Sequence, residues 1–169
     1  MRSILAALLL CAVTATATAT EPNWRVKAYL DDAAKLCAQE GGVLRTPDDR
    51  TVRLIDVNDD GHDDYVIDYR WLRCEGGNPH VFCTSDGFCA IDFLAWLPDK
   101  KEWKGFLHAS VADWRVRKGD KPALLLLQHG EFCGWKNKPK CTVVYTFRKG
   151  AMHGKFQDCL LYTSDAADE

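Results

Sequence analysis

Oxygen-bearing side chains recur at alternate positions in one short polar segment of the chain: Asp56, Asn58, Asp60 and Asp64. Gly61 provides a sharp turn inside this segment, and the backbone carbonyl of His62 follows it. Oxygen donors at positions one, three, five, seven and nine, with glycine at position six, form the ligand pattern of a calcium loop. The sequence therefore predicts a Ca²⁺ site whose ligands are the four side chains and the His62 carbonyl.

A metal-free turn is the alternative for this segment, because Asp, Asn and Gly are also the residues that turns favour. We favour calcium, since carboxylates crowded into nine residues repel one another without a cation. The twelfth position is Ile67 rather than glutamate, which argues against an EF-hand. The expected site is of the weak extracellular kind, with a Kd of about 0.1–1 mM.

The segment from Asp56 to Asp68 resembles the calcium turns of FG-GAP or VCBS-type repeats, which bind the metal in a β-hairpin turn. The chain has one copy, whereas a propeller built from such repeats needs several. Three further motifs resemble small uncharacterised exported proteobacterial proteins, namely Phe82-Cys83, Gly87-Phe88-Cys89 and His129-Gly130…Cys133. These resemblances imply an exported location and a fold, and they imply no activity.

The sequence predicts no catalytic residue. It has no Gly-x-Ser-x-Gly elbow, no His-Glu-x-x-His helix and no Gly-rich phosphate loop. His129 and Glu131 lie beside Cys133, and they are the best candidates for acid–base chemistry. A loop entering a disulfide explains them more simply, so a small envelope hydrolase using His129 or Glu131 is the alternative function.

Trp135 stands among lysines between two cysteines, an arrangement that suits sugars or anionic glycans. The simpler interpretation is a soluble loop tip whose Trp135 side chain folds back onto the sheet. In the functional interpretation, Trp135, Lys136 and Lys138 bind a glycan or an envelope protein. An inhibitor of a secreted hydrolase that presents this loop is a further alternative. The five other tryptophans lie in periodic segments and are expected in the core: Trp24, Trp71, Trp96, Trp103 and Trp114.

The two ends of the chain are expected to lie outside the folded domain. Residues 1–19 resemble a secretory signal peptide, with Arg2, a short apolar run and small residues for cleavage. Residues 159–169 resemble a translated sequencing adapter, and an ordinary acidic tail is the alternative. These boundaries leave one domain over residues 20–158, which is long enough to bury a core of its own.

Formal charge gives no indication of a nucleic-acid partner. The whole chain has 22 Lys and Arg against 24 Asp and Glu, and without Arg2 and the acids of residues 159–169 both counts are 21. A neutral domain favours neither nucleic acid nor anionic lipid. No segment after the signal is apolar enough to cross a bilayer, so we expect no integral membrane protein.

Six cysteines remain inside the expected domain: Cys37, Cys74, Cys83, Cys89, Cys133 and Cys141. An even number in an exported chain predicts three disulfides and an oxidising compartment, periplasmic or extracellular. Six cysteines permit fifteen pairings, and short loops favour Cys133 with Cys141 and Cys83 with Cys89. Zinc is the alternative use, but the two-residue spacings of zinc knuckles are absent.

One helix must precede the loop. Asn23 can cap it, one face carries Val26, Ala33 and Cys37, and Gly41 ends it. A strand period follows in six segments: 51–56, 65–69, 89–97, 103–109, 122–129 and 142–148. The segment 113–116 is a candidate for one more short strand. The expected fold is α+β, with an N-terminal helix on a mainly antiparallel sheet of five or six strands, stabilised by disulfides. The expected function is that of an exported, calcium-binding, non-enzymatic module of the cell envelope.

Overall fold

The computed structural model describes residues 23–45, 47–136, 139–148 and 151–158. The segments assigned to a signal peptide and to a non-native tail lie outside these ranges. The described residues begin with the helix α1 (Trp24–Gln39) and the strands β1 (Val43–Leu44), β2 (Val52–Ile55) and β3 (Asp64–Asp68). They continue through the 3₁₀ turn η1 (Tyr69–Trp71), β4 (Cys74–Glu75), β5 (Cys89–Leu97) and β6 (Glu102–Val111). The last elements are β7 (Asp113–Arg117), β8 (Ala123–His129), the 3₁₀ turn η2 (Gly130–Cys133), β9 (Lys140–Arg148) and β10 (Ala151–Asp158).

The helix forms where the sequence predicts it. Asn23 caps it, since its side-chain oxygen accepts a hydrogen bond of 3.0 Å from the Arg25 backbone N–H. Val26, Ala33 and Cys37 are buried along one face. Gly41 lies just beyond the helix with a φ of +80°, a left-handed conformation that other residues adopt at a cost.

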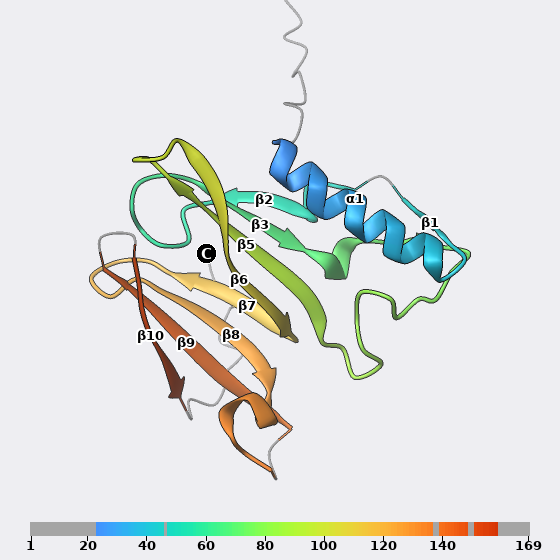
Figure 1. The fold of residues 1–169 in the computed structure, drawn as a ribbon. Coiled ribbons are helices and arrows are strands. Elements are labelled where there is room, and N and C mark those ends of the chain that lie inside the picture. Colours follow the sequence, from blue (N-terminus) through green and yellow to red (C-terminus); the bar gives the residue numbers. More distant parts are fainter. Residues whose placement is uncertain (1–22, 46, 137–138, 149–150, 159–169) are drawn as a thin grey trace, which may run out of the picture.

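Strands make two antiparallel four-stranded sheets with the orders β2-β3-β5-β6 and β10-β9-β8-β7. A third, two-stranded sheet pairs β1 with β4. Figure 1 shows the helix across one side of the first sheet and the second sheet on its other side. The chain passes from β6 to β7 through Ala112 alone, so it changes sheets within an almost continuous strand.

Two apolar clusters lie on opposite sides of the first sheet. The cluster between the sheets includes Val66, Phe93 and Leu126, all fully buried. The cluster under the helix includes Val26, Ile67 and Leu94. Because β3 and β5 supply both clusters at alternate residues, the first sheet is the middle layer of three.

The Tyr29 side chain of α1 reaches the first sheet at Gly105. A Cβ atom at this position would lie 2.7 Å from the Tyr29 hydroxyl oxygen, so a larger residue would displace the Tyr29 side chain. Glycine at this point in β6 therefore makes room for Tyr29.

The expected α+β class is confirmed, and so are the three disulfides, which join Cys37 to Cys74, Cys83 to Cys89 and Cys133 to Cys141. Such a set is typical of proteins that mature in an oxidising environment. The expectation of one sheet with five or six strands is inexact, because the strands divide between two main sheets and a short pair. Strand period indicates that a segment is extended, but not the sheet in which it pairs.

Candidate functional site

The acidic loop, residues 56–64, joins the neighbouring strands β2 and β3. Its second residue, Val57, is fully buried and belongs to the cluster between the two sheets. Asp59 and Gly61 have φ angles of 60° and 86°, so the chain turns through the left-handed region twice. The loop is therefore a tight turn fastened to the core at Val57.

Backbone N–H groups of the loop point at its own alternate oxygens. Asp56 accepts hydrogen bonds of 3.2 Å from the N–H groups of Asp60 and Gly61. Asn58 Oδ1 accepts one of 3.1 Å from Asp60, and Asp60 Oδ1 accepts one of 2.9 Å from His62. Each of these oxygens has a second lone pair, so one hydrogen bond leaves capacity for a cation.

Asp64 is the most buried carboxylate of the loop, with no exposed surface. Its Oδ2 accepts from Val57 N at 3.0 Å, and its Oδ1 accepts from Trp96 N at 3.1 Å. Burial raises the pKa of Asp64 to about 6, the two hydrogen bonds oppose this shift, and Asp60 and Asp56 add to it. A positive ion beside Asp64 would lower its pKa and relieve this repulsion.

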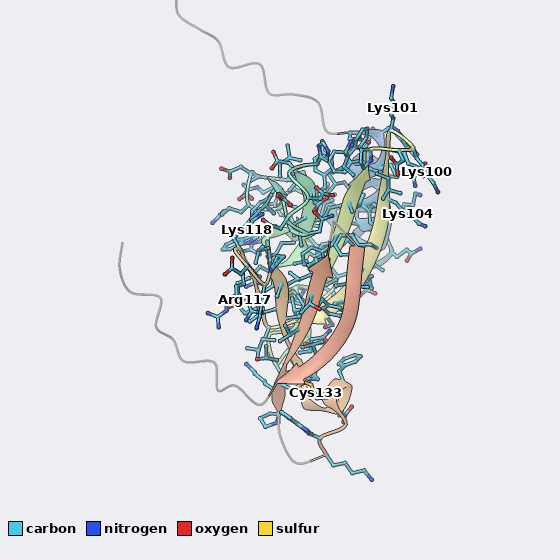
Figure 2. All side chains as sticks on the ribbon, turned by 90° about the vertical axis from the view of Figure 1, so that its left-hand side faces the viewer. Lys100, Lys101, Lys104, Arg117, Lys118 and Cys133 are labelled. Atoms are coloured by element: carbon cyan, nitrogen blue, oxygen red, sulfur yellow. A yellow bond between two sulfur atoms is a disulfide. The ribbon has the colours of Figure 1, made fainter. Side chains whose placement is uncertain are left out.

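Lys118, in the turn between β7 and β8, reaches the acidic loop from the second sheet. Its Nζ donates to the Asp56 carbonyl and lies 3.3 Å from Asp56 Oδ2 and 3.8 Å from Asp59 Oδ1. Figure 2 shows Lys118 beside Arg117, well away from Lys100 and Lys101 at the tip of the β5–β6 hairpin. An ammonium group therefore balances part of the negative charge of the loop.

Within the described residues, His, Cys, Asp and Glu side chains nowhere gather in a group of three or more that could hold a metal. Two of the five expected ligands are of another kind, namely the Asn58 amide and the His62 carbonyl. The side chains of Asp60 and Asn58 bond each other at 3.0 Å, and Asp64 is turned towards Trp96. A calcium ion would need the Asn58 and Asp60 side chains to separate, whereas each Asp64 oxygen keeps a second lone pair while it accepts from Val57 or Trp96.

An aromatic cleft of about 340 Å³ lies beside the loop and is lined by Leu54, His62, Asp63, Tyr65, Trp96 and Trp103. Trp103 is at its centre, with its ring centroid 4.4 Å from that of Tyr65 and 5.2 Å from that of Trp96. His62 and Asp63 belong to the acidic loop, so the cleft and the loop share residues.

A second hollow, of about 310 Å³, lies between α1 and the first sheet. The exposed His108 stands at its wall, and its Nδ1 is 2.8 Å from Oδ1 of the buried Asp92. Burial and the neighbouring Asp92 raise the pKa values of Tyr29 and Tyr69, which also line the hollow. Sequence reasoning missed this His–Asp pair, since the two residues meet only through the register of β5 and β6.

The expected acid–base pair is integrated into the fold around a disulfide. His129 ends β8, and its ring stacks on Phe88 with centroids 3.5 Å apart. Its Nε2 is 3.6 Å from Asp86 Oδ2, and Glu131 is exposed in η2. This arrangement fits a loop that enters the Cys133–Cys141 disulfide.

The expected ligand loop is described only in part. Trp135 is half-buried and packs against the cluster between the sheets, while Lys136 is exposed. Lys138 lies outside the described residues. Among the tryptophans expected in the core, Trp114 is buried, but Trp24 is 68% exposed. The expectation for Trp24 is wrong, because this first residue of α1 is not among those that the helix buries.

Comparison with protein-family models, with curated proteins and with solved structures found no match for this chain. In the part of the chain that the structure describes, no helix is both long enough and apolar enough to cross a membrane.

Proposed function

We propose that this chain is an exported, calcium-binding module of the cell envelope, periplasmic or secreted, and that it binds an extracellular ligand without transforming it. The observation that carries the proposal is the buried Asp64 carboxylate at the end of a loop rich in acids. Burial raises its pKa to about 6, and the two neighbouring side chains that add to the shift, Asp60 and Asp56, are acidic. Bound Ca²⁺ would offset this repulsion directly.

The proposed ligands are Asp56, Asn58, Asp60 and Asp64 through their side chains and His62 through its backbone carbonyl. His62 is exposed, and its N–H is held by Asp60, which fits a residue that contributes its backbone rather than its ring. Calcium accepts six to eight oxygens in irregular geometry, so water completes the coordination. Lys118 lies over Asp56 and leaves that position when the metal enters.

The melting temperature of the oxidised protein in 10 mM Ca²⁺ and in chelator tests the metal. With a Kd of about 0.1–1 mM, calcium stabilises the fold by about 1.4–2.7 kcal/mol. The melting temperature then rises by roughly 4–10 °C for a domain of this size. Mg²⁺ at the same concentration gives a smaller rise, because it requires octahedral geometry.

Two matched variants identify the ligands. Asp60→Asn removes a charge at a proposed ligand position and abolishes most of the rise in melting temperature. Asp63→Asn removes the same charge from an exposed residue of the same loop and retains the rise. Equal melting temperatures in calcium and chelator for the unaltered protein, with no metal found after dialysis, would refute the calcium proposal.

A further inference from the structure

The aromatic cleft presents three ring systems to solvent on one face of the first sheet. Trp96 and Trp103 are opposite each other in the β5–β6 register, and Leu54 is opposite Tyr65 in the β2–β3 register. The three aromatic side chains are half-buried, and Leu54 is 55% exposed. In Figure 1 the β2–β3 loop and the tip of the β5–β6 hairpin lie to one side of α1.

The rim of the cleft differs in chemistry from its floor. Among the described residues that line the cleft, only His62, Asp63 and Tyr65 carry ionisable side chains. Lys104 follows Trp103 in β6 and is opposite the buried Ala95, so its side chain leaves the other face of the strand. A ligand therefore meets flat aromatic surface below and hydrogen-bonding groups at one side.

A sugar ring has this same division, with C–H groups on its faces and hydroxyl groups around its edge. Tryptophan and tyrosine offer rigid apolar faces that suit the C–H groups of the sugar ring. The Asp63 carboxylate accepts hydrogen bonds from hydroxyls, whereas it repels an anionic ligand, as do the other acids of the loop. The cleft of about 340 Å³ is within the range of small-molecule sites.

We propose that this cleft binds an uncharged oligosaccharide, with one sugar ring stacked on Trp103 and Trp96 and its hydroxyls bonded to Asp63 and His62. The inference deepens the proposed function, because it gives the binding module a ligand class and a site. It moves the glycan site from the Trp135 loop to the first sheet.

Asp64 connects the cleft to the acidic loop. One carboxylate oxygen holds the backbone N–H of Trp96 in the cleft, and the other holds that of Val57 in the loop. Calcium that fixes Asp64 also fixes the backbone under Trp96. We therefore expect oligosaccharide and calcium each to tighten the binding of the other by the same factor.

Titration of the unaltered protein tests the cleft without any variant. The uncharged probes are chitohexaose, cellohexaose and laminarihexaose, and the anionic probe is a heparin hexasaccharide. The measurement follows the tryptophan indole N–H resonances by NMR. At least one uncharged probe shifts the Trp96 and Trp103 resonances and leaves those of Trp24 and Trp114 in place. No shift at Trp96 and Trp103 with millimolar uncharged probe overturns the inference, and so does a larger response to heparin.

A pair of tryptophan variants then measures how much the aromatic floor of the cleft contributes to oligosaccharide affinity. Trp103→Ala weakens binding of the responding probe roughly tenfold or more, as expected for a central aromatic contact. Trp24→Ala removes an exposed tryptophan from outside the cleft and leaves the affinity unchanged. Equal affinities of the two variants overturn the assignment to this cleft.

Repeating the titration in calcium and in chelator separates this inference from the proposed function. We expect severalfold tighter binding in calcium. Equal affinity in both conditions overturns the coupling through Asp64 and leaves the cleft as the binding site. If the oligosaccharide binds but calcium does not change the melting temperature, the calcium proposal is rejected and the oligosaccharide site is retained.

Discussion

At the scale of single residues, Lys118 places a positive charge against the acidic loop. Its Nζ contacts Asp56 twice and lies near Asp59, and its side chain is 45% exposed. An ion pair of this exposure contributes up to about 1 kcal/mol, since water screens it. In the proposed calcium-bound state, the metal would replace the ammonium beside Asp56.

Lys118→Met removes this competing charge. We expect the variant to bind calcium up to about fivefold more tightly and to lose up to about 1 kcal/mol of stability in chelator. Calorimetric titration and urea unfolding measure the two effects. Lys121→Met removes the same charge from the same turn and serves as the control. Similar calcium affinities for both variants would show that Lys118 does not compete with the metal.

The sequence predicts the residues of the loop but not their neighbours. The spacing of Asp56, Asn58, Asp60 and Asp64 is local, so it can be read without a fold. Lys118 is separated from Asp56 by 62 residues and meets it only when the two sheets face each other. The Asp64–Trp96 bond likewise depends on the pairing of β3 with β5, which the alternating pattern does not specify.

At the scale of elements, a bulge in β6 determines which residues reach the outer face of the first sheet. The register pairs Leu94 with Gly105 and Phe93 with Leu107, so Phe106 is an inserted residue. Phe106 and Leu107 both pack towards the second sheet. Trp103 and His108, five positions apart, consequently lie on the same face, which an unbroken strand would forbid.

Deleting Phe106 should rotate the first part of β6 and turn Trp103 away from Tyr65 and Trp96. We expect the near-ultraviolet circular dichroism of this aromatic cluster to collapse. Phe106→Ala, the control, loses stability through a smaller side chain but retains the inserted residue and therefore the aromatic signal. A deletion variant that keeps the signal would contradict this role of the bulge.

The same bulge explains a limit of reasoning from strand period. The segment 103–109 is predicted as a strand, and Glu102–Val111 is one. However, the inserted Phe106 shifts the alternation of side chains by one residue. Residues before and after it therefore predict opposite faces for the same strand. The helix has no such interruption, and its buried face at Val26, Ala33 and Cys37 is the predicted one.

At the scale of the whole molecule, one buried carboxylate joins the two sheets. Asp68, at the end of β3, is 3% exposed and accepts a hydrogen bond of 2.9 Å from Trp114 Nε1 in β7. Its other oxygen accepts from the backbone N–H and the Nε of Arg70, at 3.2 and 3.1 Å. Arg70 in turn lies 3.5 Å from Asp113 of β7, which adds a second connection.

Asp68→Ala leaves the indole N–H and the guanidinium without this acceptor inside the protein. We expect the free energy of unfolding to fall by about 3 kcal/mol. Asp68→Asn keeps one acceptor oxygen and should lose clearly less. Urea unfolding with an unchanged slope measures both losses. Equal losses for the two variants would mean that the hydrogen bond to Trp114 contributes little.

Neither the Asp68–Trp114 hydrogen bond nor the division into two sheets is predictable from the sequence alone, because both depend on contacts between distant strands. The change of sheet occurs at Ala112, and no proline, glycine or charge run marks it. The sequence does predict that residues 124–127 form a strand inside a sheet, since an unbroken run of leucines suits a strand covered on both faces.

The passage through Ala112 has a consequence for biosynthesis. Strands β2 to β6 finish at Val111, before any residue of the second sheet has been added to the chain. A chain that ended at β6 would therefore have a first sheet whose inner side, with Val66, Ile91 and Phe93, lacks the cover that the second sheet provides. Exposed apolar surface of this kind promotes aggregation of partly folded chains.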